Sequence, residues 1–79
     1  MFTNEMFKAY IDYAISHNEN PESEITENRL QYLSDLLFDN FDSELVDQIL
    51  DILVTIDNEN KLNVFSNLKK LNEIVPVAI

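Results

Sequence analysis

The alternation of apolar and polar positions is clearest between residues 42 and 57. At the turn of about 100° per residue of an α-helix, six apolar side chains fall on one side of this segment. They are Leu45, Val46, Ile49, Ile52, Leu53 and Ile56. Leu50 and Val54 widen the apolar arc to about 200°. A helix this apolar needs neighbours on two sides, so the segment is predicted to be the central helix of a small bundle.

Two further segments show the same spacing. Residues 4–17 follow Thr3, a good helix N-cap, and residues 59–74 follow Asn58, which is the predicted cap of a last helix. The predicted inner face of the first comprises Phe7, Tyr10, Ile11 and Ala14, with Met6, Tyr13 and His17 on one flank. The predicted stripe of the last comprises Val64, Phe65, Leu68, Leu71 and Val75, and this helix is expected to end near Ile74.

A further helix is predicted between residues 17 and 42, and it has two possible starts. Asn20 could cap a helix that begins at Pro21, or Ser23 could cap a later start. Its inward positions are Leu30, Leu33, Leu36, Leu37 and Phe41. Three asparagines that follow predicted helices, Asn18, Asn40 and Asn58, are expected to adopt the left-handed backbone of a C-cap. The prediction is an all-α fold: one domain over residues 1–79, a compact bundle of four short helices with the third one central.

The composition narrows the function classes. The chain has no cysteine and no glycine, which argues against disulfides, thiolate metal sites and glycine-rich phosphate loops. The first ten residues lack the basic start and apolar run of a signal peptide. No apolar stretch approaches the 18 or so residues of a membrane span. A cytoplasmic location is therefore expected.

The charge is strongly negative and unevenly distributed. The formal net charge is −10, and no basic residue occurs between Arg29 and Lys61. That window holds eight acids: Asp35, Asp39, Asp42, Glu44, Asp47, Asp51, Asp57 and Glu59. Such a surface repels nucleic acid and anionic membranes and attracts basic protein surfaces. We expect a protein partner, with no direct binding of nucleic acid or membrane.

No catalytic, cofactor or metal site is predicted. His17 is the single histidine, and near a helix C-terminus it is more often a partner of the helix dipole than a ligand or a base. Residues 57–61 have acids at the first and third positions of an EF-hand loop, but Leu62 replaces the glycine and Leu68 the final glutamate that the loop needs. The serines have no recognisable setting for nucleophilic catalysis.

The function expected from these observations is that of a small acidic, non-enzymatic regulator that binds a protein. In its most specific form it is an inhibitor whose carboxylates occupy a basic groove made for nucleic acid. The predicted partner-binding residues are Asp35, Phe38, Asp39, Asp42, Glu44, Asp47 and Asp51. The alternative is a homodimeric assembly module, or an immunity-type or antitoxin-type partner. The homodimer is supported by apolar residues beyond those expected in the core, which include residues 77–79.

Phe38 has three interpretations. It lies about 140° from Leu33, on the polar face of the second helix. It is either one of the scattered apolar side chains that every surface carries, or buried by the N-terminal part of the chain, or an anchor for a partner, and burial within the chain is preferred over the anchor.

Overall fold

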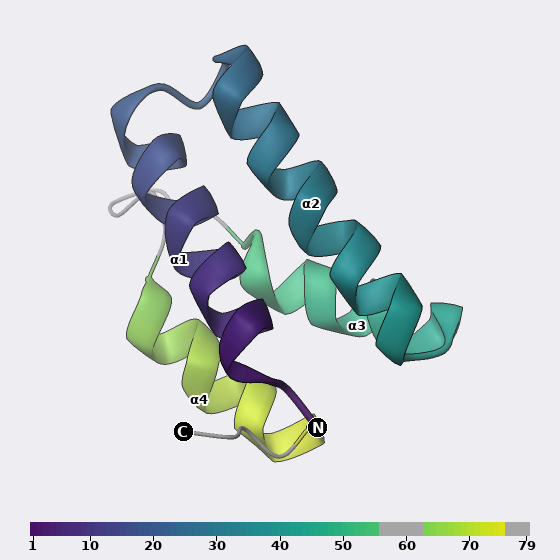
Figure 1. The fold of residues 1–79 in the computed structure, drawn as a ribbon. Coiled ribbons are helices and arrows are strands. Elements are labelled where there is room, and N and C mark those ends of the chain that lie inside the picture. The colour runs from purple at the N-terminus through teal and green to yellow at the C-terminus, as the bar shows by residue number, and fades with distance from the viewer. Residues whose placement is uncertain (56–62, 76–79) are drawn as a thin grey trace.

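The part of the chain that the structure describes forms four α-helices, as the sequence predicted (Figure 1). The computed structural model describes residues 1–55 and 63–75. The helices are α1 (Asn4–Glu19), α2 (Glu24–Asn40), α3 (Ser43–Leu53) and α4 (Val64–Ile74). Within these two ranges the chain forms no β-strand. The predicted cap Asn58, residue Ile56 of the central stripe and the apolar residues 77–79 lie outside the described residues.

Each helix begins at a polar side chain that accepts a hydrogen bond from a backbone N–H three residues later. These bonds run from Met6 to Thr3 (3.3 Å), Thr26 to Ser23 (3.2 Å), Leu45 to Asp42 (2.9 Å) and Ser66 to Asn63 (3.0 Å). Each satisfies an N–H that has no partner inside its helix. Thr3 was predicted, Ser23 decides between the two starts of the second helix, and the start of the last helix is corrected to Val64.

The central helix is shorter than predicted. It ends at Leu53 rather than near Asp57. At Thr55 the helical pattern of backbone hydrogen bonds ends, because the Thr55 N–H donates to the carbonyl of Ile52 and not to that of Asp51. The Thr55 hydroxyl donates to the carbonyl of Asp51.

Two of the three asparagines, Asn18 and Asn40, do not have the predicted left-handed backbone, and Asn58 lies outside the described residues. Asn18 and Asn40 lie inside α1 and α2, and no residue in the described ranges has a positive φ. Helices α1 and α2 end at residues of extended backbone, Asn20 and Phe41. Asn40 still helps to close its helix, because its side-chain amide donates to the carbonyl of Leu36 at 2.8 Å. A backbone carbonyl at a helix end can thus find a hydrogen-bond donor without a residue in the left-handed conformation.

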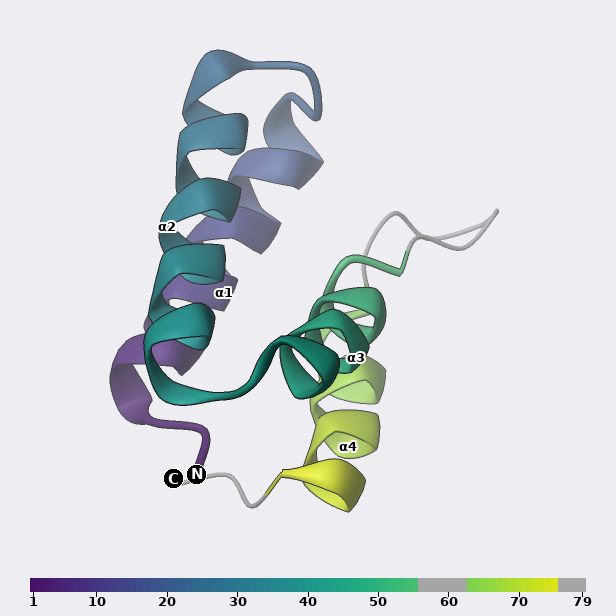
Figure 2. The ribbon, with the colours of Figure 1, turned by 90° about the vertical axis from the view of Figure 1, so that its right-hand side faces the viewer.

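The helices pack as two neighbouring pairs. Helices α1 and α2 run antiparallel, α3 leaves α2 at a steep angle, and α4 packs on α3 (Figures 1 and 2). Helix α3 contacts α2 as well as α4, which is the central position that its wide apolar arc predicted. The radius of gyration is 11.8 Å, close to the value of about 11.6 Å expected for a compact chain of this length.

The core follows the predicted stripe on α3. Val46, Ile49 and Leu53 are fully buried, and the other apolar side chains of the helix lie half-buried at the edge. Helix α2 contributes Leu33 and Leu37 in the same way. These two helices therefore bury the faces that their sequence patterns indicated.

On α1 the buried face is rotated relative to the prediction. Phe7 and Ile11 are only half-buried, whereas the predicted flank is inside the molecule. The buried side chains of the helix are Met6, Ala9, Tyr10, Tyr13, Ala14, Ser16 and His17. A polar contact with α2 contributes to this, because Ser16, which is buried on this side of α1, accepts a hydrogen bond from Arg29.

On α4 one predicted core position is wrong. Phe65 is 87% exposed, and the position two residues later, Asn67, is buried in its place. The amide of Asn67 donates to the hydroxyl of Tyr10 on α1 at 3.2 Å. A buried polar group needs such a partner, and the pair joins the first helix to the last.

Candidate protein-binding surface

The seven predicted partner-binding residues all lie at the surface. Asp35, Phe38 and Asp39 belong to the C-terminal half of α2, Asp42 to the connection, and Glu44, Asp47 and Asp51 to α3. Every one of them is exposed. We call these seven residues the acidic surface.

The local sequence places these side chains opposite the core. On α2, Asp35 and Asp39 are one helical turn apart, on the side away from Leu33 and Leu37. On α3 the carboxylates alternate with the buried stripe in the same manner. Burial of the apolar stripes thus fixes the carboxylates toward solvent.

A two-residue connection brings the two acidic helix faces together. Helix α2 ends at Asn40 and α3 begins at Ser43. Because the chain turns so tightly, the end of α2 and the start of α3 share one corner of the molecule (Figure 2). Asp39, Asp42 and Glu44 therefore belong to this corner, while Asp47 and Asp51 continue along α3.

The acidic surface carries no basic partner within residues 1–55 and 63–75. The ion pair in these ranges joins Lys8 to Asp12 on α1, at 3.2 Å. Two carboxylates of the acidic surface accept neutral hydrogen bonds: Asp35 from the Gln31 amide at 2.9 Å, and Asp42 from a backbone N–H as the α3 cap. Its negative charge is therefore not neutralised by another side chain described here.

Phe38 is the apolar member of the acidic surface. Its ring is 52% exposed, so the preferred interpretation of full burial within the chain is wrong. Asp35 precedes it by three residues and Asp42 follows it by four, so the ring has a carboxylate on either side along the chain. An exposed aromatic ring bordered by polar groups is a common feature of protein interfaces.

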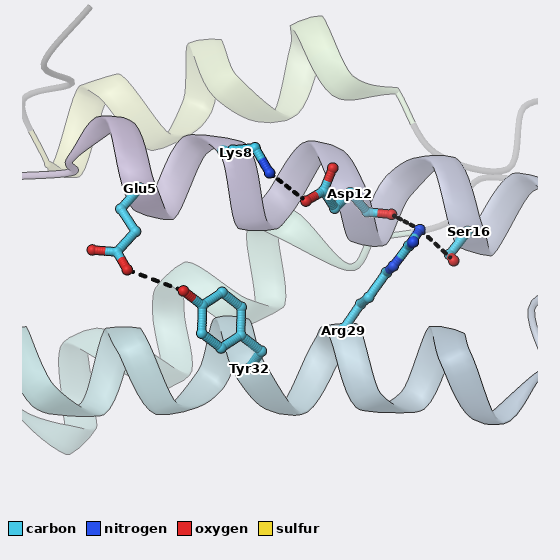
Figure 3. A network of polar contacts seen from close by, with 6 residues as sticks. All are labelled: Glu5, Lys8, Asp12, Ser16, Arg29 and Tyr32. Atoms are coloured by element: carbon cyan, nitrogen blue, oxygen red, sulfur yellow. Dashed lines mark hydrogen bonds and ion pairs between the residues drawn. The ribbon is translucent and has the colours of Figure 1, made fainter.

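A network of hydrogen bonds between α1 and α2 involves Arg29 and Tyr32 (Figure 3). Arg29 donates to the backbone carbonyl of Asp12 at 3.2 Å and to the hydroxyl of Ser16 at 2.9 Å. Tyr32 donates to the carboxylate of Glu5 at 3.0 Å, and this bond raises the pKa of the Tyr32 hydroxyl. The network links the two helices, so Arg29 is used within the chain.

The described residues contain no group of three metal-ligating side chains. His17 lies in the last turn of α1, as expected, but it is buried, with its ring centroid 5.7 Å from that of Tyr13. Its Nδ1 has no hydrogen-bond partner. None of the described helices is long and apolar enough to cross a membrane.

One group of exposed residues was missed by the sequence interpretation. Lys69 and Lys70 are exposed on α4, and Phe65 lies one turn before Lys69. We call these three residues the α4 face. The spacing of Phe65 and Lys69 could have indicated it, but Phe65 had been assigned to the core.

Comparisons of this chain with protein family models, with curated proteins and with solved structures found no match.

Proposed function

We propose that this protein acts in the cytoplasm as a non-enzymatic regulator that binds a basic protein through its acidic surface. In the specific form of the proposal, the partner is a nucleic-acid-binding protein and the carboxylates occupy its groove. The observation that carries the proposal is six exposed carboxylates without a basic partner among the described residues, with a half-exposed aromatic ring between them.

The spacing of the carboxylates supports an imitation of phosphates. Along α3, Glu44, Asp47 and Asp51 follow one another at about 5 Å along the helix axis, given a rise of about 1.5 Å per residue. Phosphates follow one another at about 3.4 Å per strand of DNA. The charge density is lower but of the same order, so lysines and arginines spaced for a nucleic acid can meet several carboxylates at once.

Phe38 supplies what charge alone lacks. Exposed ion pairs contribute about 0–1 kcal/mol each, so an acidic face alone gives fast association and little specificity. A ring that enters an apolar recess of the partner adds affinity that depends on shape. The proposal therefore assigns attraction to the carboxylates and recognition to Phe38.

The test compares charge-reversed variants as immobilised baits for proteins of the native host. One variant carries Asp47→Lys and Asp51→Lys. Its matched control carries Glu19→Lys and Glu22→Lys, which changes the net charge equally at exposed positions near the opposite end of α2. A partner should be retained by the wild-type protein and by the control, and lost from the first variant.

A retained partner is then tested for the proposed groove. It should bind a DNA or RNA duplex, and the wild-type protein should displace that duplex in a mobility-shift assay. Retention that is equal for both variants contradicts the role of the acidic surface. A partner that binds the protein and the duplex at the same time contradicts the imitation of phosphates.

A further inference from the structure

The α4 face is the second surface of this molecule with a distinct chemistry. Phe65 is 87% exposed, more than the other large apolar side chains in the described ranges. Lys69 lies one turn beyond it, Lys70 follows about 140° from Phe65 around the helix, and both lysines are exposed. An exposed aromatic ring with a cation one turn away and a second cation next to that one is the chemical complement of Phe38 with its neighbouring carboxylates.

The two surfaces do not neutralise one another within one copy. Helix α4 packs on α3, which carries Glu44, Asp47 and Asp51, whereas Asp35, Phe38 and Asp39 are on α2 (Figures 1 and 2). In the ranges that the structure describes, no ion pair joins Lys69 or Lys70 to a carboxylate. Among the described residues, both surfaces are therefore exposed and have no partner of opposite charge.

We propose that copies of this chain associate head to tail, with the α4 face of one copy docked on the acidic surface of the next. Lys69 and Lys70 then lie against Asp35 and Asp39 of the neighbouring copy, and the rings of Phe65 and Phe38 meet. The occupant is a second copy because this chain itself provides the complementary charge and ring.

The geometry predicts how the assembly grows. A contact between two different surfaces leaves one of each kind unused, so a pair of copies can add a third and form an open chain or a closed ring. The net charge of −10 on each copy opposes this growth, so the association is expected to be weak. The acidic surface is shared with the proposed function, but self-association requires no foreign partner, and either can fail without the other.

The experiment is a charge exchange between two variants of the full chain, followed by sedimentation velocity from micromolar to millimolar concentration. The first variant carries Lys69→Glu and Lys70→Glu, and the second carries Asp35→Lys and Asp39→Lys. The wild-type protein should associate as its concentration rises. Each variant alone should associate about tenfold more weakly or not at all, because like charges then face each other.

An equimolar mixture of the two variants should restore association, since each contact again pairs opposite charges. A wild-type protein that stays monomeric up to millimolar concentration overturns the proposal, and so does a mixture that associates no better than its components. Association that survives Lys69→Glu and Lys70→Glu unchanged also overturns it, and indicates a different contact.

The role of the ring is tested separately. Phe65→Ser, in an otherwise unchanged chain, should weaken self-association by about tenfold or more relative to the wild-type protein, as expected for a hot-spot aromatic residue. The matched control is Ile25→Ser, which removes an exposed apolar side chain from α2 at 60% exposure. Equal effects of the two substitutions contradict a specific role of Phe65. Circular dichroism of each variant verifies that the helices are retained.

Discussion

The hydrogen bond between Tyr10 and Asn67 offers a sharp test of how α1 and α4 are joined. Tyr10 is fully buried and Asn67 is 3% exposed, so water cannot replace either partner. Tyr10→Phe removes the hydroxyl and leaves the Asn67 amide without this acceptor. An unsatisfied buried donor costs about 1–3 kcal/mol. A domain of this length has a free energy of unfolding of about 4–12 kcal/mol, so the loss is a large fraction of the total.

The second arm of the test removes both partners. Asn67→Leu in the wild-type background leaves the tyrosine hydroxyl unsatisfied and should also destabilise the protein. Combined with Tyr10→Phe, the same substitution puts apolar groups on both sides, and the double variant should recover most of the loss. The coupling between the two positions is expected to be about 1–3 kcal/mol.

The assay is urea denaturation monitored by circular dichroism for the wild-type protein and the three variants. The slopes against urea should stay the same, because the surface exposed on unfolding hardly changes. A coupling below about 0.5 kcal/mol would show that the two side chains contribute independently and that the hydrogen bond does not join α1 to α4.

Three more predictions concern stability. Leu53→Ala on α3 should cost about 2–5 kcal/mol in urea denaturation, whereas a loss below about 1 kcal/mol would remove α3 from the centre of the core. Burial raises the pKa of Tyr10 and of Tyr13 above the ordinary 10.0, so the unfolded chain ionises first and stability should fall as the pH rises above about 10. Thermal melts at several alkaline pH values test this, and Tyr10→Phe should flatten the decline. The double substitution Asp47→Lys and Asp51→Lys should stabilise the isolated protein by a few tenths of a kcal/mol in the same urea assay, because it relieves the repulsion between carboxylates on α3. A loss of stability would contradict the exposure of these carboxylates to solvent.

The core-facing side of α3 is the feature that could be predicted most directly from the sequence. On α3 the apolar side chains form a wide arc, and polar ones fill the rest, so the direction of the core follows from spacing alone. The cap Thr3 could be predicted for a similar reason, since a cap bonds only to the backbone three residues away. The exposure of the carboxylates was also within reach, because charged groups rarely lose water without a partner.

The features that escaped prediction depend on distant parts of the chain. Asn67 is inside the molecule because Tyr10, 57 positions earlier, accepts its hydrogen bond. No local pattern indicates that partner, so Phe65 was the natural choice for the core. Phe38 is similar: its exposure depends on whether another helix covers that side of α2, and the sequence around it is silent on this point. The α4 face went unnoticed for the same reason.

The pairing of helices that are neighbours along the chain has a consequence for how the protein folds. Helix α1 packs on α2 and α3 on α4, so most contacts close short loops, and such topologies fold in microseconds to milliseconds. The bond between Tyr10 and Asn67 closes the longest loop between helices and is expected to form after the rate-limiting step. Its loss should therefore accelerate unfolding and leave the folding rate nearly unchanged. The lifetime of the native state then depends on the contact between α1 and α4 that Tyr10 and Asn67 make.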